Sequence, residues 1–222
     1  MAVRSPGGRV NQKARTRMAI VSAARELIQT GQPVTMPAVA QAALVSEPTA
    51  YRYFPDLLSL LTESFAGLWP DPEQALRPVA GSSDAAERIA CATEFLFRHV
   101  LAYQGAVRAM IAATITRPEL AHARPGLRFG LIDHALAPLR DTLAVTDPDT
   151  FGQLRLDLAV VVSAEALFTL TDLCGLTPEQ AITSATRTAR TLTTAACGPA
   201  IPGGPAIPGG PAIPGRSSER NR

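Results

Sequence analysis

One short stretch of the sequence gathers an unusual density of hydrogen-bonding and aromatic side chains. Residues 45–56 read VSEPTAYRYFPD, with three aromatic residues and an arginine between two prolines, in a chain otherwise rich in alanine and poor in aromatics. Tyrosine and arginine form hydrogen bonds with phosphate oxygens, and threonine offers a base its hydroxyl or thymine its methyl group. The stretch is therefore suited to contact phosphates and base edges. The alternative is that Tyr51 and Tyr53 are half-buried core aromatics.

Two short helices joined by a tight turn are expected to position these side chains. Thr35 is placed to cap the first helix. Ser46 is placed to cap the second by accepting from the backbone N–H of Thr49, and a three-residue turn precedes it. Pro55 ends the second helix because it disfavours helical geometry at Phe54. A helix of about seven residues, on the order of 10 Å long, fits the DNA major groove end-on, and this order of elements is typical of a helix-turn-helix motif.

Flanking helices are expected on both sides of this motif. Apolar residues at helical spacing predict a first helix over Thr16–Gln29, with Thr16 as its cap and Gly31 ending it in the left-handed conformation. Residues 1–12 are expected to form a flexible basic arm. A further helix should begin after Asp56, its cap, and run to about Leu68.

The charge of the chain is informative through its distribution. The 222 residues are 46% hydrophobic and 18% charged, with a net charge of +2, which suits a soluble globular protein with one or two domains. Six basic residues precede the first acid, Glu26, which indicates a local polyanion contact or, alternatively, a solvated tail. These basic residues are Arg4, Arg9, Lys13, Arg15, Arg17 and Arg25.

The remainder of the chain also predicts helices and no sheet, so the fold class is all-α. Residues 69–83 are expected to be a linker with a possible short turn of helix. A helical ligand-binding and dimerisation domain is expected over residues 84–197, after a DNA-binding domain over residues 13–68. Residues 198–222, with GPAIPG read three times, are expected to be a disordered tail. The helices expected in the second domain are Asp84–Tyr103, Ala106–Thr116, Leu127–Leu143, Asp149–Cys174 and Pro178–Ala196.

Two further sets of residues are candidates for binding in the second half. Small apolar residues spaced by three and four positions form a narrow seam on the last helix, which predicts a dimer interface or, alternatively, ordinary packing within the chain. The seam comprises Ile182, Ala185, Ala189 and Leu192. Aromatic, methionine and polar residues could line a ligand pocket, although such stripes are more often plain core. These are Phe95, Arg98, His99, Met110, Phe129, His134 and Phe168.

The N-terminal motif as a whole resembles a known family. Residues 35–61, TMPAVAQAALVSEPTAYRYFPDLLSLL, resemble the DNA-binding domain of TetR-family transcriptional regulators, and the resemblance extends back through TRMAIVSAARELI at residues 16–28. It covers about residues 13–68. The resemblance implies a homodimeric regulator, with a repressor expected, that binds a roughly palindromic DNA operator and responds to an unidentified small-molecule inducer. The residues that it implies in DNA binding are Lys13, Arg17, Thr35, Ser46, Glu47, Pro48, Thr49, Tyr51, Arg52 and Tyr53.

Three positions depart from the family pattern. Family members commonly carry glycine where Leu44 stands, because the turn requires positive φ, so leucine should cost on the order of 1 kcal/mol unless the turn is built differently. Many members carry lysine where Glu47 and Leu57 stand. Two usual phosphate contacts are therefore missing, and Glu47 would repel phosphate unless it accepts from the amino group of a cytosine.

Other functional classes find little support in the sequence. No GxSxG, HExxH, P-loop or dinucleotide motif argues for an enzyme, although an all-helical enzyme and a DNA-binding module without a sensor remain alternatives. Neither a cofactor nor a metal is expected, because Cys91, Cys174 and Cys197 lack metal-ligand spacing and are most simply idle thiols in a reducing compartment. The absence of a signal peptide and of a long apolar run predicts a cytoplasmic protein without a membrane span.

Overall fold

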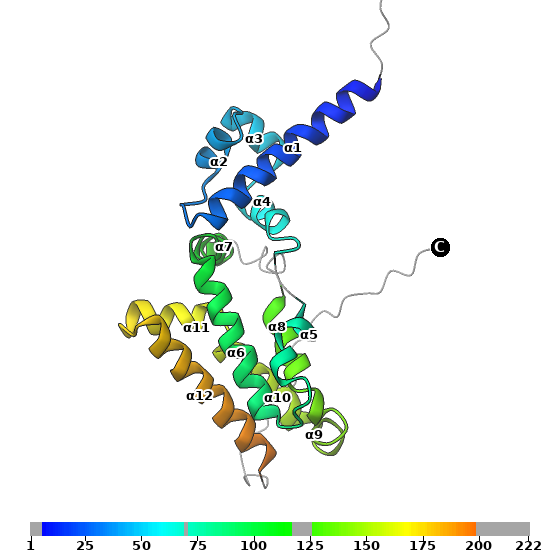
Figure 1. The fold of residues 1–222 in the computed structure, drawn as a ribbon, viewed down its shortest axis with the longest axis vertical. Coiled ribbons are helices and arrows are strands. Elements are labelled where there is room, and N and C mark those ends of the chain that lie inside the picture. Colours follow the sequence, from blue (N-terminus) through cyan, green and yellow to red (C-terminus); the bar gives the residue numbers. More distant parts are fainter. Residues whose placement is uncertain (1–5, 69–70, 117–125, 199–222) are drawn as a thin grey trace, which may run out of the picture.

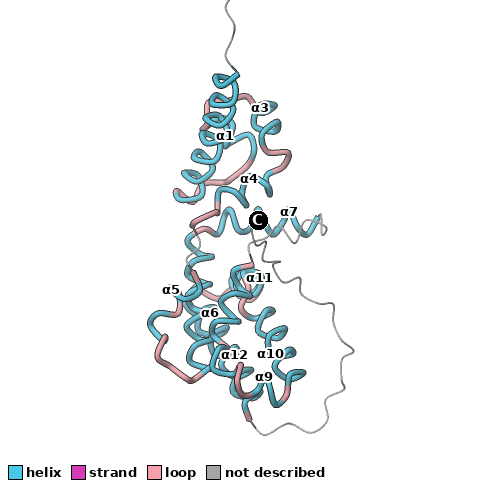
Figure 2. The backbone as a smooth tube through the Cα atoms, turned by 90° about the vertical axis from the view of Figure 1, so that its right-hand side faces the viewer, coloured by secondary structure: helices cyan, strands magenta, loops and turns pink. Residues whose placement is uncertain are grey.

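The computed structural model describes residues 6–68, 71–116 and 126–198, and every regular element within those ranges is helical. The all-α prediction is therefore confirmed. The helices form two lobes, with α1–α4 in the first and α5–α12 in the second, as Figure 1 shows. Seen after a quarter turn, α7 crosses between α4 and the second lobe (Figure 2). No helix in the described ranges is long and apolar enough to span a membrane.

The first lobe is built as the sequence predicts around the helix-turn-helix motif. Thr35 accepts from the backbone N–H of Ala38 at 3.2 Å, and Asp56 accepts from that of Ser59 at 2.8 Å, so both caps are confirmed. Gly31 has φ 69° and ends the first helix in the left-handed conformation, also as predicted. The four helices are α1 (Pro6–Gln29), α2 (Met36–Ala42), α3 (Glu47–Tyr53) and α4 (Leu57–Ser64).

The prediction of a flexible arm over residues 1–12 is wrong from Pro6 onward. Helix α1 begins at Pro6, ten residues before the expected start. Proline is well tolerated in a first helical turn, and residues 9–15 contain neither glycine nor proline, so nothing stops the helix from extending. Thr16 is consequently not a cap, and its hydroxyl donates to the Gln12 carbonyl one turn earlier, at 3.1 Å.

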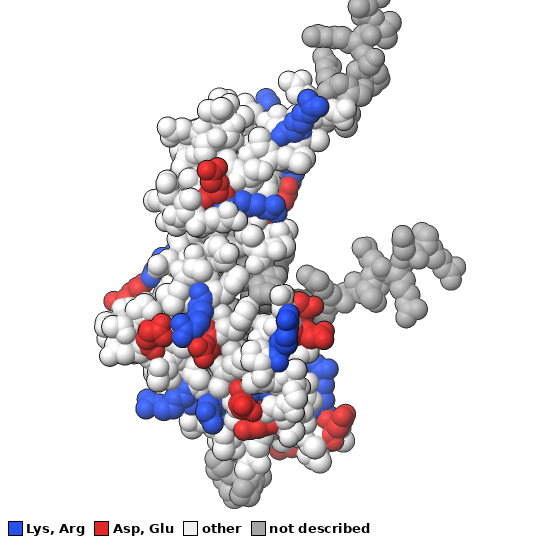
Figure 3. All heavy atoms as spheres, viewed as in Figure 1, with Lys and Arg blue, Asp and Glu red and all other residues white. Residues whose placement is uncertain are grey.

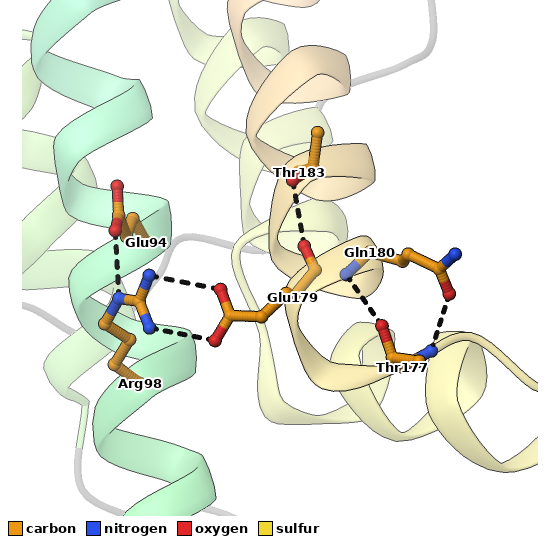
Figure 4. A network of polar contacts seen from close by, with 6 residues as sticks. All are labelled: Glu94, Arg98, Thr177, Glu179, Gln180 and Thr183. Carbon is orange, nitrogen blue, oxygen red and sulfur yellow. Dashed lines mark hydrogen bonds and ion pairs between the residues drawn. The ribbon is translucent and has the colours of Figure 1, made fainter.

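The second lobe is a packed set of helices around α6. Asp84, Asp147 and Thr177 cap helices α6, α10 and α12 by accepting from backbone N–H groups of the first turn. Thr177 also forms a reciprocal pair with Gln180 at the start of α12 (Figure 4). The helices are α5 (Pro72–Ala75), α6 (Ala85–Ala102), α7 (Gln104–Thr116), α8 (Leu127–Ala135), α9 (Leu143–Thr146), α10 (Pro148–Val161), α11 (Ala164–Phe168) and α12 (Pro178–Cys197).

Residues 71–80 of the expected linker contribute two buried residues to the core of the second lobe. Helix α5 and the 3₁₀ turn Arg77–Val79 follow each other, and Ala75 and Leu76 are buried. The nearby guanidinium of Arg88, only 5% exposed, donates to the Val79 carbonyl at 3.0 Å and to the carbonyls of two residues at the end of α8. These two are His134, at 2.8 Å, and Ala135, at 3.1 Å. Side-chain packing and this buried arginine thus fix a segment whose prolines suggested a linker.

Two long helices of the prediction are interrupted. The one expected over Leu127–Leu143 ends at Ala135, and a 3₁₀ turn containing Pro138 leads to α9. The one expected over Asp149–Cys174 breaks at Ser163, which has extended φ −148° and ψ 153°. The Ser163 hydroxyl accepts from the backbone N–H of Ala166 at 3.0 Å, so it caps α11, and a π-helical turn, Thr169–Leu173, follows. Local hydrogen bonding by serine outweighs the continuous apolar pattern here.

Candidate nucleic-acid interface

Helix α3 is oriented by two buried residues on its inner face. Ala50 and Phe54 are almost inaccessible to solvent and pack in the core of the first lobe. Because one side of this short helix is buried, the opposite side must face outward. The side chains exposed there are those of Ser46, Glu47, Pro48, Tyr51 and Arg52.

The turn before α3 closes α2 through a left-handed residue. Leu44 has φ 55° and is 93% exposed. Its N–H donates to the Gln41 carbonyl at 3.1 Å, and the N–H of Val45 donates to the Ala40 carbonyl at 2.9 Å, which is the Schellman pattern that usually contains glycine. The turn therefore has the geometry common to the motif, and the predicted backbone strain falls on Leu44.

The predicted side-chain cap of α3 is not formed. Ser46 is the N-cap residue in extended conformation, but its hydroxyl lies 2.9 Å from the Thr49 hydroxyl instead of accepting from a backbone N–H. The backbone N–H of Thr49 donates to the Ser46 carbonyl. The pair of hydroxyls therefore stays at the surface, where each oxygen retains further hydrogen-bonding capacity.

A groove of about 580 Å³ runs between the N-terminal half of α1 and the outer side of α3. It brings together five of the residues implied in DNA binding: Lys13, Ser46, Thr49, Arg52 and Tyr53. Three further residues complete its walls, namely Gln12, Thr16 and Val45. Gln12 and Thr16 were missed in the sequence because α1 was expected to start too late to form a wall. Tyr51 is 46% exposed, whereas the half-buried Tyr53 lies beneath the Arg52 guanidinium, 5.7 Å from its ring centroid.

Arg17 does not line this groove, and its exposed side chain contacts α4 and the end of α3 instead. Its guanidinium forms an ion pair with Glu63 of α4, donates to the Tyr53 carbonyl at 3.1 Å and lies 4.3 Å from the centroid of the Phe54 ring. Arg25, two turns later on α1, donates to the carbonyls of Ser64 and Ala66 at the end of α4. Both arginines thus fasten α1 to α4. Thr35, also implied in DNA binding, lies outside the groove.

Charged side chains are sparse on the first lobe. In the view of Figure 3 most of its surface is uncharged, with basic groups along α1 and acidic groups only on its lower part, whereas both signs are mixed over the second lobe. No group of His, Cys, Asp and Glu residues in the described ranges could hold a metal ion. The groove offers hydroxyl, amide and cationic groups for hydrogen bonding.

The residues proposed for a ligand pocket do not surround one described cavity. Met110 is buried in the core, and Phe168 lies under the Arg108 guanidinium, 3.8 Å from its ring centroid. Phe95 stacks on His99, with 6.0 Å between ring centroids. Phe129 lies beside Arg128, and His134 uses its backbone carbonyl to hold Arg88.

Arg98 lies on the surface, contrary to the pocket prediction. It forms ion pairs with Glu94 of α6 at 2.9 Å and with Glu179 of α12 at 3.2 Å (Figure 4). These hydrogen bonds to carboxylates raise the pKa of its guanidinium. The three residues lie at one end of an open groove of about 770 Å³ along α12.

The seam predicted as a dimer interface is buried within the chain. Ile182, Ala185 and Ala189 pack in the core of the second lobe, where α12 lies against α6 and α10, and Leu192 is partly buried against the same core. The alternative reading, ordinary packing within the chain, is therefore correct for these residues. Their small side chains allow neighbouring helices to approach closely, which explains the narrow pattern.

Comparison with known families agrees with this geometry. Residues 20–63, from α1 to the end of α4, match the family model described as bacterial regulatory proteins, tetR family. No curated protein and no solved structure matches the chain. The matched segment includes the helix-turn-helix motif and the exposed face of α3. Residues 20–63 therefore form a DNA-binding domain of the tetR type, which is found in bacterial transcriptional regulators.

Proposed function

We propose that the protein is a cytoplasmic repressor that binds a roughly palindromic operator as a homodimer and leaves it when a small molecule binds the second lobe. The observation that carries the DNA-binding part is the groove between α1 and α3, because it gathers Lys13, Arg52 and four hydroxyl groups beside an outward-facing helix. A DNA strand running through this groove would receive phosphate contacts from both walls while α3 enters the major groove.

The roles of individual residues follow from their places. Lys13 and Arg52 are cationic, and Tyr53 supplies a hydroxyl, so these three suit the phosphate backbone. Ser46 and Thr49 lie at the start of α3, where recognition helices approach base edges, and Tyr51 is exposed on the same helix. Arg17 is left out of the proposed contacts because its guanidinium is engaged with Glu63.

Fluorescence anisotropy with the DNA upstream of the gene, beside a scrambled duplex, tests this proposal. Arg52→Ala should weaken binding and reduce the salt dependence by about one unit of slope, since one phosphate contact is lost. Arg140→Ala is the matched control, because Arg140 is also exposed but lies in the second lobe. Equal loss from both variants would contradict the assignment of α3 as the reading element. Should the upstream DNA not bind, selection from random duplexes would supply the operator.

A homodimer would use the outer faces of α10 and α12, since their inner faces are occupied. Leu156 and Val160 are one turn apart on α10 and are 47% and 72% exposed. Gly152 precedes them by one turn and has open space where a side chain would be. An exposed apolar stripe of this kind is suited to pack against its twofold-related copy.

Charge also favours this face. Asp149 and Asp157 flank the stripe on α10, whereas α12 exposes Arg187 and Arg190. Under twofold symmetry the acidic helix of one protomer can meet the basic helix of the other, which gives the contact a preferred orientation.

Sedimentation velocity measures this association. Val160→Asp should shift a dimer to monomer and weaken operator binding, since two recognition helices must then bind independently. Val145→Asp, on α9, is the matched control because Val145 is 71% exposed but lies away from the proposed face. A Val160→Asp variant that stays dimeric would place the interface elsewhere.

Ligand response requires a route from the second lobe to α3. Helix α7 packs on α4, and α4 is fastened to α1 by Arg17 and Arg25, so movement of α7 would reorient the DNA-binding helices as a unit. In a dimer, the spacing of the two α3 helices must match the operator. An inducer that binds more tightly to a conformation with another spacing would shift the dimer population toward that conformation and so release the DNA. A compound that raises the melting temperature and also releases the protein from operator DNA would support this part. Stabilising compounds without effect on DNA binding would favour a lobe used only for dimerisation.

A further inference from the structure

One acidic side chain on the proposed DNA-facing side of the first lobe forms no hydrogen bond or ion pair with the other described residues. Residues 11–68 contain four acids. Asp56 caps α4, Glu63 pairs with Arg17, and Glu26 lies near the far end of α1. Glu47, the fourth, is exposed, and no hydrogen bond or ion pair to its carboxylate is found within the described ranges.

Glu47 lies where a negative charge works against binding DNA in general. It is the first residue of α3, between Ser46 and the exposed Pro48, and next to the groove that Ser46 and Thr49 line. A carboxylate that faces phosphates repels them and lowers affinity for every sequence. A carboxylate that faces a base edge can instead accept a hydrogen bond, and residues at the start of a recognition helix are the ones that meet base edges.

The chemistry of the major groove selects the base. An ionised carboxylate only accepts hydrogen bonds, so it needs a donor. Cytosine offers its N4 amino group alone, whereas the N6 amino group of adenine lies beside the acceptor N7, which would repel the second carboxylate oxygen. Guanine and thymine present acceptors at this edge. We propose that Glu47 is a specificity-determining residue that selects cytosine at one position in each half-site; this inference rests on the proposed binding of α3 in the major groove.

Selection of binding sites from random duplex DNA tests the proposal with three proteins. The wild type should enrich sites with cytosine at one position of each half-site. Glu47→Gln should lose that preference by about tenfold and favour adenine instead, because glutamine pairs with N6 and N7 together. Glu26→Gln is the matched control: it removes the same charge from an exposed position on α1, ten residues or about 15 Å along the helix from Thr16 in the groove wall.

The outcomes separate this inference from the proposed function. A wild type that enriches no sequence would overturn the proposed operator binding itself. A wild type that enriches a site, together with a Glu47→Gln variant that enriches the same site, would overturn only the role of Glu47. A uniform gain in affinity of Glu47→Gln for selected and scrambled duplexes, with unchanged base preference, would show that the carboxylate acts as simple charge repulsion and would also contradict the inference.

Discussion

The ring of Tyr103, at the end of α6, meets the ring of Phe65, at the end of α4, edge to face, with 6.2 Å between their centroids. The Tyr103 ring also lies edge to face with the ring of His99, with 4.9 Å between their centroids, and the His99 ring stacks on that of Phe95. A row of rings therefore leads from the middle of α6 to the core of the DNA-binding lobe. Phe65 is fully buried there, so displacement of Tyr103 must disturb the packing of α4.

Replacement of Tyr103 should weaken the packing between α6 of the second lobe and α4 of the first. Tyr103→Ala removes edge contacts with Phe65 and His99 and should lower the free energy of unfolding by about 1–3 kcal/mol. Tyr103→Phe keeps the ring contacts and serves as the control. Urea unfolding followed by circular dichroism measures the difference, and equal stability of all three proteins would contradict a structural role for the ring row.

His99 should make stability depend on pH in a narrow window. Burial lowers the pKa of His99 below its ordinary value, so the unfolded chain binds the proton more readily. The stabilising contribution is thus fully present above about pH 6.5 and is lost as the pH falls from there toward the lower folded pKa. We therefore expect the melting temperature to decrease when the pH is lowered from 7.5 to 5.5.

The control for this pH effect is a second histidine. His99→Gln should flatten the dependence in that window, whereas His134→Gln should keep it. Asp147 and Asp172 also have lowered pKa values, caused by hydrogen bonds from Thr150 and Arg108, but carboxylates of this kind titrate below the window. An unchanged pH profile in His99→Gln would rule out this histidine as the source.

Leu44→Gly should stabilise the protein. The left-handed φ of Leu44 strains its Cβ, and its side chain is almost fully exposed, so glycine removes strain without loss of packing. Since glycine also gains entropy in the unfolded chain, we expect a net gain of about 0.5–1 kcal/mol. Leu44→Ala keeps a Cβ and should give no comparable gain. Chemical denaturation of the wild type and the two variants measures their free energies of unfolding. Equal changes for Leu44→Gly and Leu44→Ala would argue against strain at this turn.

Lys13 and Arg17 should behave differently in DNA binding although both are basic residues of α1. Lys13→Ala should reduce the salt dependence by about one unit of slope and leave stability unchanged. Arg17→Ala should lower stability by about 1 kcal/mol, since it removes an exposed ion pair together with the contacts to Tyr53 and Phe54. Its salt slope should stay that of the wild type. A lower slope in Arg17→Ala would place this arginine on the phosphate backbone after all.

Arg88 should be among the most sensitive positions of the second lobe. Arg88→Met leaves the carbonyls of Val79, His134 and Ala135 without their buried donor, so we expect a loss of about 3 kcal/mol or more. Arg77→Met is a control, because Arg77 is exposed in the neighbouring 3₁₀ turn. Thermal unfolding measures both, and a mild effect at Arg88 would mean that solvent replaces the lost hydrogen bonds.

The candidate site could be predicted well where a structural feature depends only on residues close together in the sequence. Thr35, Asp56 and Gly31 act at helix ends within a few residues of themselves, so their roles can be inferred directly from the chain. The positive φ at Leu44 was expected from the resemblance to the TetR family, whose members commonly carry glycine there.

Interactions between distant residues escaped prediction. Arg17 was expected at phosphates but binds Glu63, 46 residues later, and nothing in the local sequence pairs them. The seam at Ile182, Ala185 and Ala189 has a pattern that fits contact with any helix, and only packing against α6 and α10 decides which one. The break at Ser163 was hidden by the apolar residues around it.

By itself, the sequence determined the helical fold, the helix-turn-helix motif with the caps Thr35 and Asp56, and the exposed chemistry of α3, since each depends on contacts within one or two turns of the chain. The tertiary structure decided which polar groups remain available. It paired Arg17 with Glu63, placed Gln12 and Thr16 of an extended α1 opposite α3, and left the Glu47 carboxylate without a hydrogen bond or ion pair among the described residues. A side chain can bind a ligand only through polar groups that are not already hydrogen-bonded or ion-paired within the protein. Which groups remain available depends on contacts between residues that are far apart in the sequence.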